Sequence, residues 1–384
     1  MTPCAVSPRD PEFVQNPYPA YRGMRATPFF RWEAYDCAAT ARLEMVDRVL
    51  RDRRFGREVP AAERARRPAH LAPFYAIDDH SMLERDPPVH TRLRSLVTRA
   101  FTSRRVEALA PEIRALARGL AEGLTPGADL IPAFAEPLPV RVIAHLLGVP
   151  EERAPDLLAW SHAMVAMYQS RRDRAVEDAA LAAVEAFQGY LGTLLQERRR
   201  SPRDDLLSAL IAARDAEDRL SEAELVATVI LLLNAGHEAT VNAIAIGAKV
   251  MLESGRRGGS GLVEEILRFD PPLHVFERRA REDVEIDGQR FAAGERIALV
   301  LGAAGRDPEA VRDPDVFDPN RSATPHLAFG AGIHFCVGAP LARLELQIAL
   351  ETLFACHPTL ALAEAPRFAD RYHFRALERL QITL

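Results

Sequence analysis

The sequence is poor in lysine and cysteine and has no long uninterrupted apolar segment. Lys249 is the only lysine among 49 basic residues, and the formal net charge is −5, so the chain offers no overall basic field for nucleic acid. The four cysteines have neither the density nor the spacing of a disulfide framework or a zinc ribbon, which favours a reducing cytoplasm. No segment reaches the roughly 20 uncharged apolar residues of a membrane span, and the N-terminal segment lacks the apolar run of a signal peptide. We therefore expect a soluble, cytoplasmic protein that binds neither nucleic acid nor a membrane.

The chain is long enough to bury a large core, with 384 residues of which 48% are hydrophobic. From Thr102 to about Leu252, leucine and alanine recur at spacings of three and four between Pro and Gly breaks, which predicts successive helices. Around Asp287 and Gly288, apolar and polar residues alternate, which predicts a β-hairpin. We found no internal repeat and no long linker. The sequence thus predicts one mainly α-helical domain over residues 1–384, with a small β part.

The longest periodic element begins at Ser221 with a capping box, S-E-A-E, and continues without proline to about Glu253. Its middle, LLLNAGHEATVNAI, is apolar on all sides apart from a few polar residues, so this helix is expected to be buried. Buried polar side chains need partners or a task. The polar residues in question are Asn234, His237, Glu238, Thr240 and Asn242.

Cys336 lies in a loop with glycine at positions 330, 332 and 338, directly before a predicted helix. Glycine allows unusual dihedral angles and close approach to a flat surface, and a helix N-terminus stabilises a thiolate. A nucleotide-binding loop lacks support because the third glycine and the strand before it are missing. A zinc site is not supported either, because no second pair of ligands at the required spacing accompanies Cys336. A structural cysteine, a nucleophile and a ligand of a metal remain as interpretations.

The stretch from Phe329 to Arg343, F-G-x-G-x-H-x-C-x-G-x-x-L-A-R, resembles the complete haem-binding signature of the cytochrome P-450 family of haem-thiolate monooxygenases, and the likeness extends from about Asp10 to the end. The resemblance implies the P-450 fold and haem b (iron protoporphyrin IX) as cofactor. It implies that Cys336 is the axial iron ligand, that Phe329 packs against the proximal porphyrin face, and that Gly338 and Ala235 lie at the cofactor.

Two further segments support the resemblance. Glu265 and Arg268 match the family's E-x-x-R, and Arg321 would complete a buried Glu-Arg-Arg cluster behind the thiolate loop. On its own, E-x-x-R is more often an exposed ion pair. The family's haem-propionate contacts correspond to four residues here, although the neighbouring Arg279 is an alternative for one of them. These residues are His90, Arg94, Arg278 and His334.

The run AGHEAT, residues 235–240, resembles the family's oxygen-binding segment with one departure. Ala239 stands where the family usually has a threonine whose hydroxyl helps deliver protons. Thr240 is one residue further on, about 100° around the helix, so it does not simply substitute. Glu238 remains available for a proton path. A water held by Glu238 and by backbone opened around Gly236, or a hydroxyl of the substrate, is expected to complete the relay.

The resemblance implies an oxidoreductase that inserts one oxygen atom of O2 into an apolar or mixed organic molecule. Electrons would come from a separate ferredoxin-type iron–sulfur protein and its NAD(P)H-dependent reductase, because no such domain is fused. The alternatives are a peroxide-driven or oxygen-independent enzyme and a haem-binding sensor. At Ser254–Gly261 the chain is shorter than the family and is expected to lack a helix. The residues expected to face substrate are Ala61–Met82, Leu232, Ala235, Ala239 and Leu273–Phe276.

Overall fold

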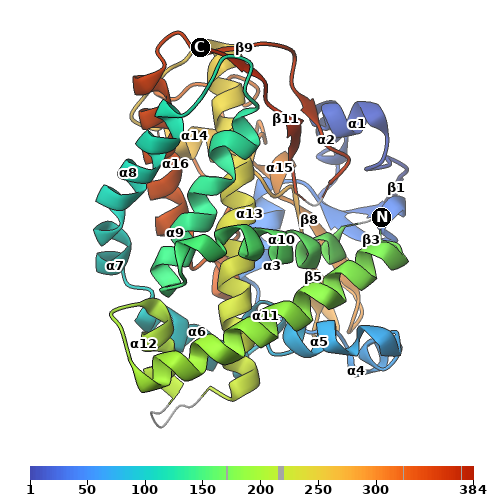
Figure 1. Cartoon of the computed structure of the whole chain (residues 1–384). Coiled ribbons are helices and arrows are strands. Elements are labelled where there is room, and N and C mark those ends of the chain that lie inside the picture. The colour runs from blue at the N-terminus through green and yellow to red at the C-terminus, as the bar shows by residue number, and fades with distance from the viewer. Residues whose placement is uncertain (170–171, 215–219, 323, 373) are drawn as a thin grey trace. The chain divides into compact units, whose positions relative to one another are not determined.

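A computed structural model describes residues 1–169, 172–214, 220–322, 324–372 and 374–384, and it divides the chain into two compact units. Each unit is assembled from segments far apart in the sequence, and the long helix α13, Glu222–Ser254, begins in the second unit and ends in the first (Figure 1). The first unit comprises Met1–Gly56, Arg114–Ala135 and Ala239–Leu384. The second comprises Arg57–Ile113 and Glu136–Glu238.

A six-stranded sheet organises the first unit, in the strand order β1-β2-β3-β8-β5-β4. Strand β3 pairs in parallel with β8, so that Ala38 lies opposite Ile297, and β5 pairs antiparallel with β8. The sequence predicts strands only around Asp287 and Gly288, so the N-terminal strands of this sheet were not predicted. The strands of the sheet are β1 (Thr2–Cys4), β2 (Phe30–Trp32), β3 (Cys37–Thr40), β4 (Phe55–Gly56), β5 (Val275–Ala280) and β8 (Arg296–Val300).

Both faces of this sheet are covered. Alternate residues of a strand point to opposite faces. Accordingly, Ile297 and Leu299 of β8 belong to one buried apolar cluster, together with Val46 of α3, whereas Ala298 and Val300 belong to another with Trp32. This double burial explains why β8 reads as a nearly continuous apolar run.

The predicted hairpin is confirmed: β6 (Val284–Ile286) pairs antiparallel with β7 (Gln289–Phe291). Asp287 and Gly288 between them have φ values of 52° and 75°, and two consecutive positive φ angles are the mark of a type I′ turn. Two short antiparallel pairs also belong to the first unit. They are β9 (Ala361–Leu362) with β12 (Ile382–Thr383), and β10 (Arg367–Phe368) with β11 (Leu377–Arg379).

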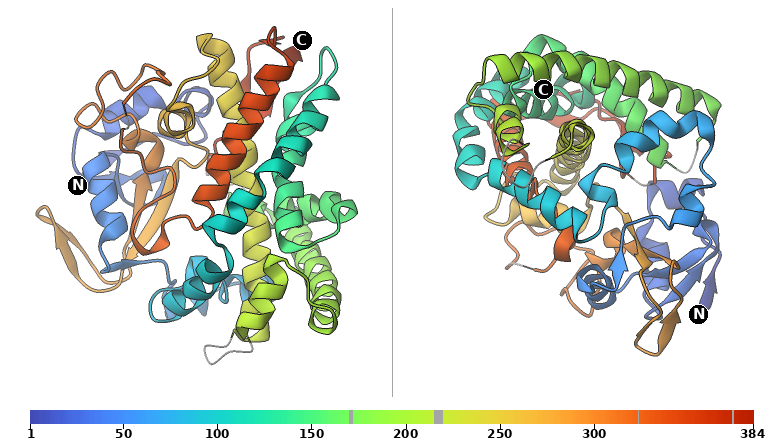
Figure 2. Two further views of the ribbon diagram at one scale, coloured as in Figure 1. Left: turned by 90° about the vertical axis from the view of Figure 1, so that its left-hand side faces the viewer. Right: turned by 90° about the horizontal axis from the view of Figure 1, so that it is seen from below.

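Helices α14 and α16 of the first unit pack against the C-terminal half of α13, and Figure 2 shows α16 running beside it. A Cβ atom on Gly247 of α13 would lie 3.0 Å from Leu350 and 3.1 Å from Ile266, so this glycine lets the three helices approach. The helices with residues in the first unit are α1 (Pro11–Gln15), α2 (Tyr18–Met24), α3 (Leu43–Arg51), α8 (Ala110–Glu122), α14 (Leu262–Phe269), α15 (Leu301–Ala304) and α16 (Ala339–Cys356).

The described residues of the second unit form helices joined by loops and include no strand, and from Thr102 on this agrees with the periodicity of the sequence. Helices α10 and α11 lie side by side (Figure 1), with the rings of Trp160 and Phe187 4.9 Å apart between centroids. Besides the first half of α13, its helices are α4 (Ala61–Arg64), α5 (Ala72–Asp78), α6 (Val89–Ala100), α7 (Ser103–Ala108), α9 (Pro137–Leu147), α10 (Ala154–Val165), α11 (Arg174–Arg200) and α12 (Leu206–Arg214).

Helix α13 begins at the capping box that the sequence predicts. The Ser221 backbone N–H donates to the Glu224 carboxylate at 2.8 Å, and the Glu224 N–H donates to the Ser221 hydroxyl at 3.1 Å. Among the described residues, α13 is the one helix long and apolar enough to cross a membrane by length and composition. Of its most apolar 18-residue window, 72% is buried inside the protein, as in the core helix of a soluble protein. Residues 255–261, which link α13 to α14, contain no helix, as expected.

Candidate functional site

Cys336 lies on the loop between a 3₁₀ turn, Gly332–His334, and the N-terminus of α16. Its backbone N–H donates to the carbonyl oxygen of Phe329 at 3.0 Å, which closes the loop on itself. Gly338 is the residue directly before α16, and because glycine has no side chain it supplies no side-chain cap to the helix N–H groups. The thiol therefore lies beside the positive end of an 18-residue helix, which favours a negative charge on sulfur.

Two glycines of this loop are required by backbone geometry. Gly330 and Gly332 have φ values of 67° and 70°, in the left-handed region that side chains disfavour. A Cβ atom on Gly332 would lie 2.3 Å from the carbonyl oxygen of Leu50, and one on Gly330 would lie 3.3 Å from the ring of Phe276. These two glycines thus let the loop pack against protein, whereas the sequence analysis attributed them to close approach of a flat cofactor. Of the three, only at Gly338 would an added Cβ atom have the Cys336 Sγ as its neighbour, at 3.8 Å.

An ion-pair cluster of Arg343, Glu264 and His326 lies against the ring of Phe329. The sequence does not mark these three residues as one cluster. The Arg343 guanidinium lies over the Phe329 ring at 4.5 Å, and its Nε donates to Glu264 at 2.6 Å. The Nε2 of His326 lies 2.9 Å from the same carboxylate. The hydrogen bond from His326, together with the Arg343 contact, lowers the pKa of Glu264 to about 2. Glu264 directly precedes Glu265 of the E-x-x-R motif, and this adjacency is the sequence signal that could have pointed to the cluster.

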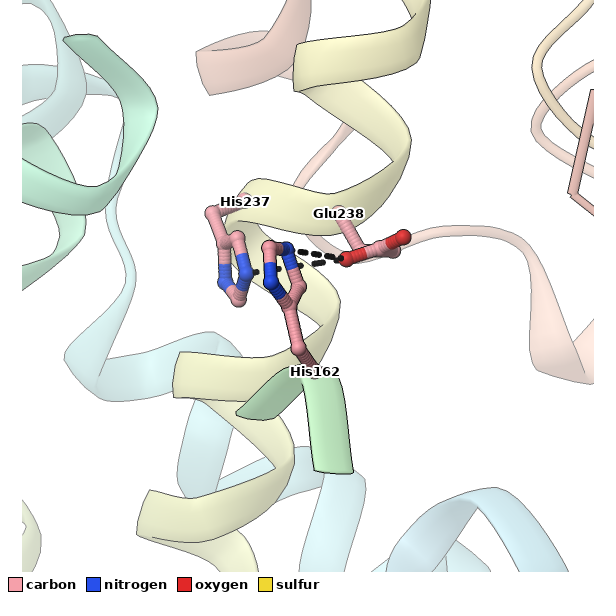
Figure 3. Close-up of side chains that lie close together, drawn as sticks. All are labelled: His162, His237 and Glu238. Carbon is pink, nitrogen blue, oxygen red and sulfur yellow. Dashed lines mark ion pairs between the residues drawn. The ribbon is translucent and has the colours of Figure 1, made fainter. Parts of the chain in front are cut away.

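Glu238 lies in the middle of α13, where two histidines approach its carboxylate (Figure 3). The Glu238 Oε2 atom is 3.3 Å from the Nε2 of His162 on α10 and 3.7 Å from the Nε2 of its neighbour His237. His237 and Glu238 are buried, and the side chain of His162 is 39% exposed. The sequence indicates Glu238 as a candidate but carries no signal for His162.

Helix α13 runs without a break through Gly236, so the expected opening of the backbone there is wrong. The physical reason for this glycine is close packing against α9. A Cβ atom on Gly236 would lie 2.9 Å from the Cγ1 atom of Ile143. One turn apart on the same face of α13, Ala235 is exposed and Ala239 partly exposed, whereas Thr240 is buried.

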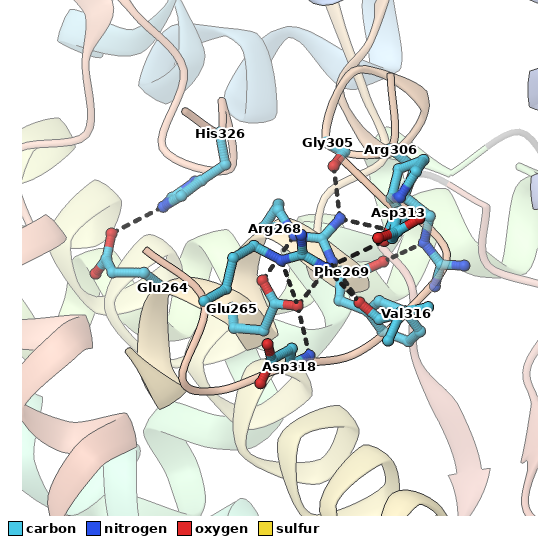
Figure 4. A network of polar contacts seen from close by, with 12 residues as sticks. Glu264, Glu265, Arg268, Phe269, Gly305, Arg306, Asp313, Val316, Asp318 and His326 are labelled. Atoms are coloured by element: carbon cyan, nitrogen blue, oxygen red, sulfur yellow. Dashed lines mark hydrogen bonds and ion pairs between the residues drawn. The ribbon is translucent and has the colours of Figure 1, made fainter. Parts of the chain in front are cut away.

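Glu265 and Arg268 lie together (Figure 4). Arg321 joins them, as the resemblance implies. Arg268 donates two hydrogen bonds to the Glu265 carboxylate at 2.7 and 2.8 Å, and the Arg321 Nε lies 3.5 Å from it. Arg268 also donates to the carbonyl oxygens of Gly305 and Pro314, and the Asp318 backbone N–H donates to Glu265. Because Glu265 and Arg268 are both buried, this is a structural ion pair rather than an exposed one.

The four residues matched to propionate contacts lie in both units. In the second unit, the buried His90 and the partly buried Arg94 are one turn apart on α6. In the first unit, Arg278 on β5 is 3% exposed, whereas Arg279 is only partly buried and reaches the carbonyl oxygen of Gly294 at 3.4 Å. Burial therefore favours Arg278 over Arg279 as the residue with an internal role. His334 ends the 3₁₀ turn before Cys336.

The Cys336 loop has the donor chemistry of a group that is bound through a single thiolate. All four cysteines are present as thiols. The one cluster of three metal-ligating side chains in the described part of the chain is that of His162, His237 and Glu238, not one that includes Cys336. A single thiolate at a helix N-terminus, where a Cβ atom on Gly338 would lie 3.8 Å from the sulfur, fits an iron atom that takes its remaining ligands from a macrocycle.

Comparison with known proteins identifies one family. The family model described as Cytochrome P450 matches residues 260–356. The chain is 40% identical over 396 residues to "Cytochrome P450 107B1" of Saccharopolyspora erythraea, covering 97% of this chain and 96% of that protein. It is 41% identical to the "Vitamin D(3) 25-hydroxylase" of Pseudonocardia autotrophica, with 97% and 94% covered. The crystal structure of P450BioI in complex with a fatty-acid-ligated acyl carrier protein has a TM-score of 0.90, with 34% identity, 98% of this chain and 100% of that chain covered.

Proposed function

Because the chain belongs to the cytochrome P450 family of haem-thiolate monooxygenases, we propose that Cys336 binds the iron of haem b and that the protein oxidises a hydrophobic small molecule. The position of Cys336 at the N-terminus of α16, in a loop bent by Gly330 and Gly332, carries the proposal. When bound, the haem supplies the activation of O2, and thiolate ligation favours O–O cleavage. The expected product contains one oxygen atom from O2.

The protein's own residues would position the cofactor. Phe329 is held by Arg343 and would present its other side to the porphyrin, with Gly338 leaving room beside the sulfur. His90 and Arg94 on α6, with Arg278 and His334, would bind the two propionates. Two carboxylates removed from water need several charged or donating partners to offset their desolvation. Ala235 would lie at the cofactor.

Protons would reach the reacting oxygen by way of Glu238. Ala239 has no hydroxyl, and Thr240 is buried about 100° further around the helix. We propose that a water molecule held by Glu238, or a hydroxyl of the substrate, completes the relay. In this proposal Glu238 acts through a water or a substrate hydroxyl, and neither Ala239 nor Thr240 supplies the hydroxyl that a direct threonine relay would use.

Electrons are proposed to come from a ferredoxin-type iron–sulfur protein and its NAD(P)H-dependent reductase, and the protein is proposed to act in the cytoplasm as one haem domain over residues 1–384. The substrate is proposed to be apolar or mixed in character. One relative is named as a vitamin D3 hydroxylase, and one solved relative holds an acyl carrier protein that bears a fatty acid, so free and carrier-bound acyl groups belong in a substrate screen.

The test combines a spectrum with turnover. Thiolate ligation gives the reduced carbonyl complex a strongly red-shifted Soret band, which Cys336→Ser should abolish while Cys4→Ser, Cys37→Ser and Cys356→Ser leave it unchanged. Steady turnover with a surrogate ferredoxin and reductase supports the monooxygenase, and turnover with peroxide alone would favour the peroxide-driven alternative. Haem binding without either activity would favour a sensor. Retention of the band in Cys336→Ser would refute the assignment of the ligand.

A further inference from the structure

The cluster of His162, His237 and Glu238 has a second property, which does not depend on the haem. The three potential ligand atoms, two imidazole nitrogens and one carboxylate oxygen, all lie within 4.8 Å of one another. They come from two helices of the second unit, α10 and α13, and Figure 3 shows the side chains pointing toward one another. Two histidines and one carboxylate are a donor set typical of zinc sites that keep an open position.

The hydrogen bond of His237 fixes which of its nitrogens faces Glu238. Its Nδ1 lies 2.9 Å from the carbonyl oxygen of Leu233, and a carbonyl only accepts, so Nδ1 carries the proton. The Nε2 atom therefore presents a lone pair, and it is buried with no hydrogen-bond partner among the described residues. An N–H donated to a backbone carbonyl is also what orients ligating histidines in metal sites.

Two lone pairs thus face each other in a buried place, at the His237 Nε2 and the Glu238 Oε2. Their separation of 3.7 Å is too long for a shared proton, since a hydrogen bond requires about 3.2 Å or less. A cation placed between them would accept a lone pair from each. Tetrahedral zinc with bonds of about 2.0 to 2.2 Å separates its ligand atoms by about 3.3 to 3.6 Å. The observed separations, 3.3 Å to His162 and 3.7 Å to His237, match that edge length within small side-chain rotations.

We propose that His162, His237 and Glu238 form a binding site for a divalent transition-metal ion such as Zn²⁺, with the fourth coordination position open to water. The exposed edge of His162 gives the ion a path from solvent, and the buried pair on α13 supplies the two ligands that are already oriented. On the proposed function, an ion here also withdraws Glu238 from proton delivery, so less product would form per NAD(P)H oxidised while Zn²⁺ is bound.

The test is Zn²⁺ binding to the haem-loaded protein after chelator treatment, measured as bound metal per chain by equilibrium dialysis. We expect one tightly bound ion, with affinity reduced at least 10-fold in His162→Ala and in Glu238→Gln, because loss of even an outer-shell partner costs 10- to 100-fold. His162→Ala changes a partly exposed side chain, and Glu238→Gln keeps the shape, so both should fold. Metal content does not depend on turnover, and failure of the proposed function would leave this result unchanged.

His145→Ala is the matched control. His145 also contacts a carboxylate, with its Nδ1 2.7 Å from Glu112, but this pair is exposed and belongs to no cluster of three ligands in the described part of the chain. Its removal should leave the tight ion in place. Crystals soaked in Zn²⁺ should show an anomalous peak within bonding distance of His162, His237 and Glu238. Equal affinity in the wild type and both site variants, no ion retained by the wild type, or a peak elsewhere would overturn the proposal.

Discussion

Replacing Glu265 with alanine should destabilise the protein by about 3 to 5 kcal/mol, the usual cost of removing one partner of a buried ion pair. The magnitude follows from the burial of Arg268, whose side chain is 0% exposed. Without Glu265, two of the Arg268 hydrogen bonds, at 2.7 and 2.8 Å, disappear, and the partners that remain to it among the described residues are carbonyl oxygens such as those of Gly305 and Pro314. The Asp318 N–H loses its acceptor as well. Because domains are stable by only about 5 to 15 kcal/mol, we expect little folded, haem-containing protein.

The assay is urea unfolding followed by circular dichroism, together with haem bound per chain. Glu265→Gln keeps an acceptor in the same place and should lose less than the alanine variant. The control is Glu264→Ala, one residue away, which removes an ion pair whose carboxylate side chain is 43% exposed and should cost no more than about 1 kcal/mol. If Glu265→Ala and Glu264→Ala unfold at the same urea concentration, burial does not set the energy of this cluster and the reasoning fails.

Three further predictions concern the cofactor, the relay and pH. Arg94→Ala and Arg278→Ala should each retain less haem after gel filtration, whereas Arg279→Ala, at the less buried position, should retain it as the wild type does; equal retention in all three would mean that the positions are matched wrongly. Ala239→Thr should raise product per NAD(P)H oxidised for poorly fitting substrates and lower it for the native one by displacing the water; unchanged ratios across a substrate series would exclude position 239 from proton delivery. Burial, with the nearby Glu84, raises the pKa of Asp78 to about 7 from an ordinary value of 3.8, and Tyr168 donates to this carboxyl at 2.7 Å. An acid with a raised pKa binds its proton more tightly in the folded protein, so the stability of the wild type falls as pH rises from about 4 to 7. The urea midpoint of Asp78→Asn should therefore increase relative to that of the wild type between pH 5 and pH 8. Parallel pH profiles of the two proteins would contradict this.

Local signals in the sequence predicted the local structure. The capping box of α13 and the Asp287–Gly288 turn are specified by residues within four positions of one another, and both form as expected. The N-terminal strands carry no comparable signal, because they are two to four residues long and are stabilised by distant partners. Ala38 pairs with Ile297, 259 residues away, and this pairing cannot be read from alternation within CAAT.

The glycines of the Cys336 loop show how a residue type can be predicted correctly for an incomplete reason. The motif identified the loop, and the left-handed φ angles of Gly330 and Gly332 explain why glycine is required there. The closest neighbour of a Cβ atom at Gly332, however, is the backbone of Leu50, at the end of α3 and 282 positions earlier. Only tertiary structure could reveal that contact, since nothing near Leu50 in the sequence marks it as a partner of the loop.

The same limit applies to His162 and changes how the acid on α13 is interpreted. His237 and Glu238 are adjacent, and adjacent residues project about 100° apart on a helix, so the sequence gives no reason to expect their side chains to meet. The cluster of three forms because α10 brings His162, from 76 positions earlier in the sequence, within 3.3 Å of the Glu238 carboxylate. A carboxylate that faces two imidazoles is a different chemical group from one beside a threonine hydroxyl: it can exchange a proton with His162 at the exposed edge or share a metal ion with both rings. The alanine in place of threonine at position 239 and the contact between His162 and Glu238 therefore need to be tested together. The test combines Ala239→Thr with His162→Ala. If His162→Ala leaves the coupling ratio unchanged, both alone and together with Ala239→Thr, His162 has no part in proton delivery and its role is confined to the metal site.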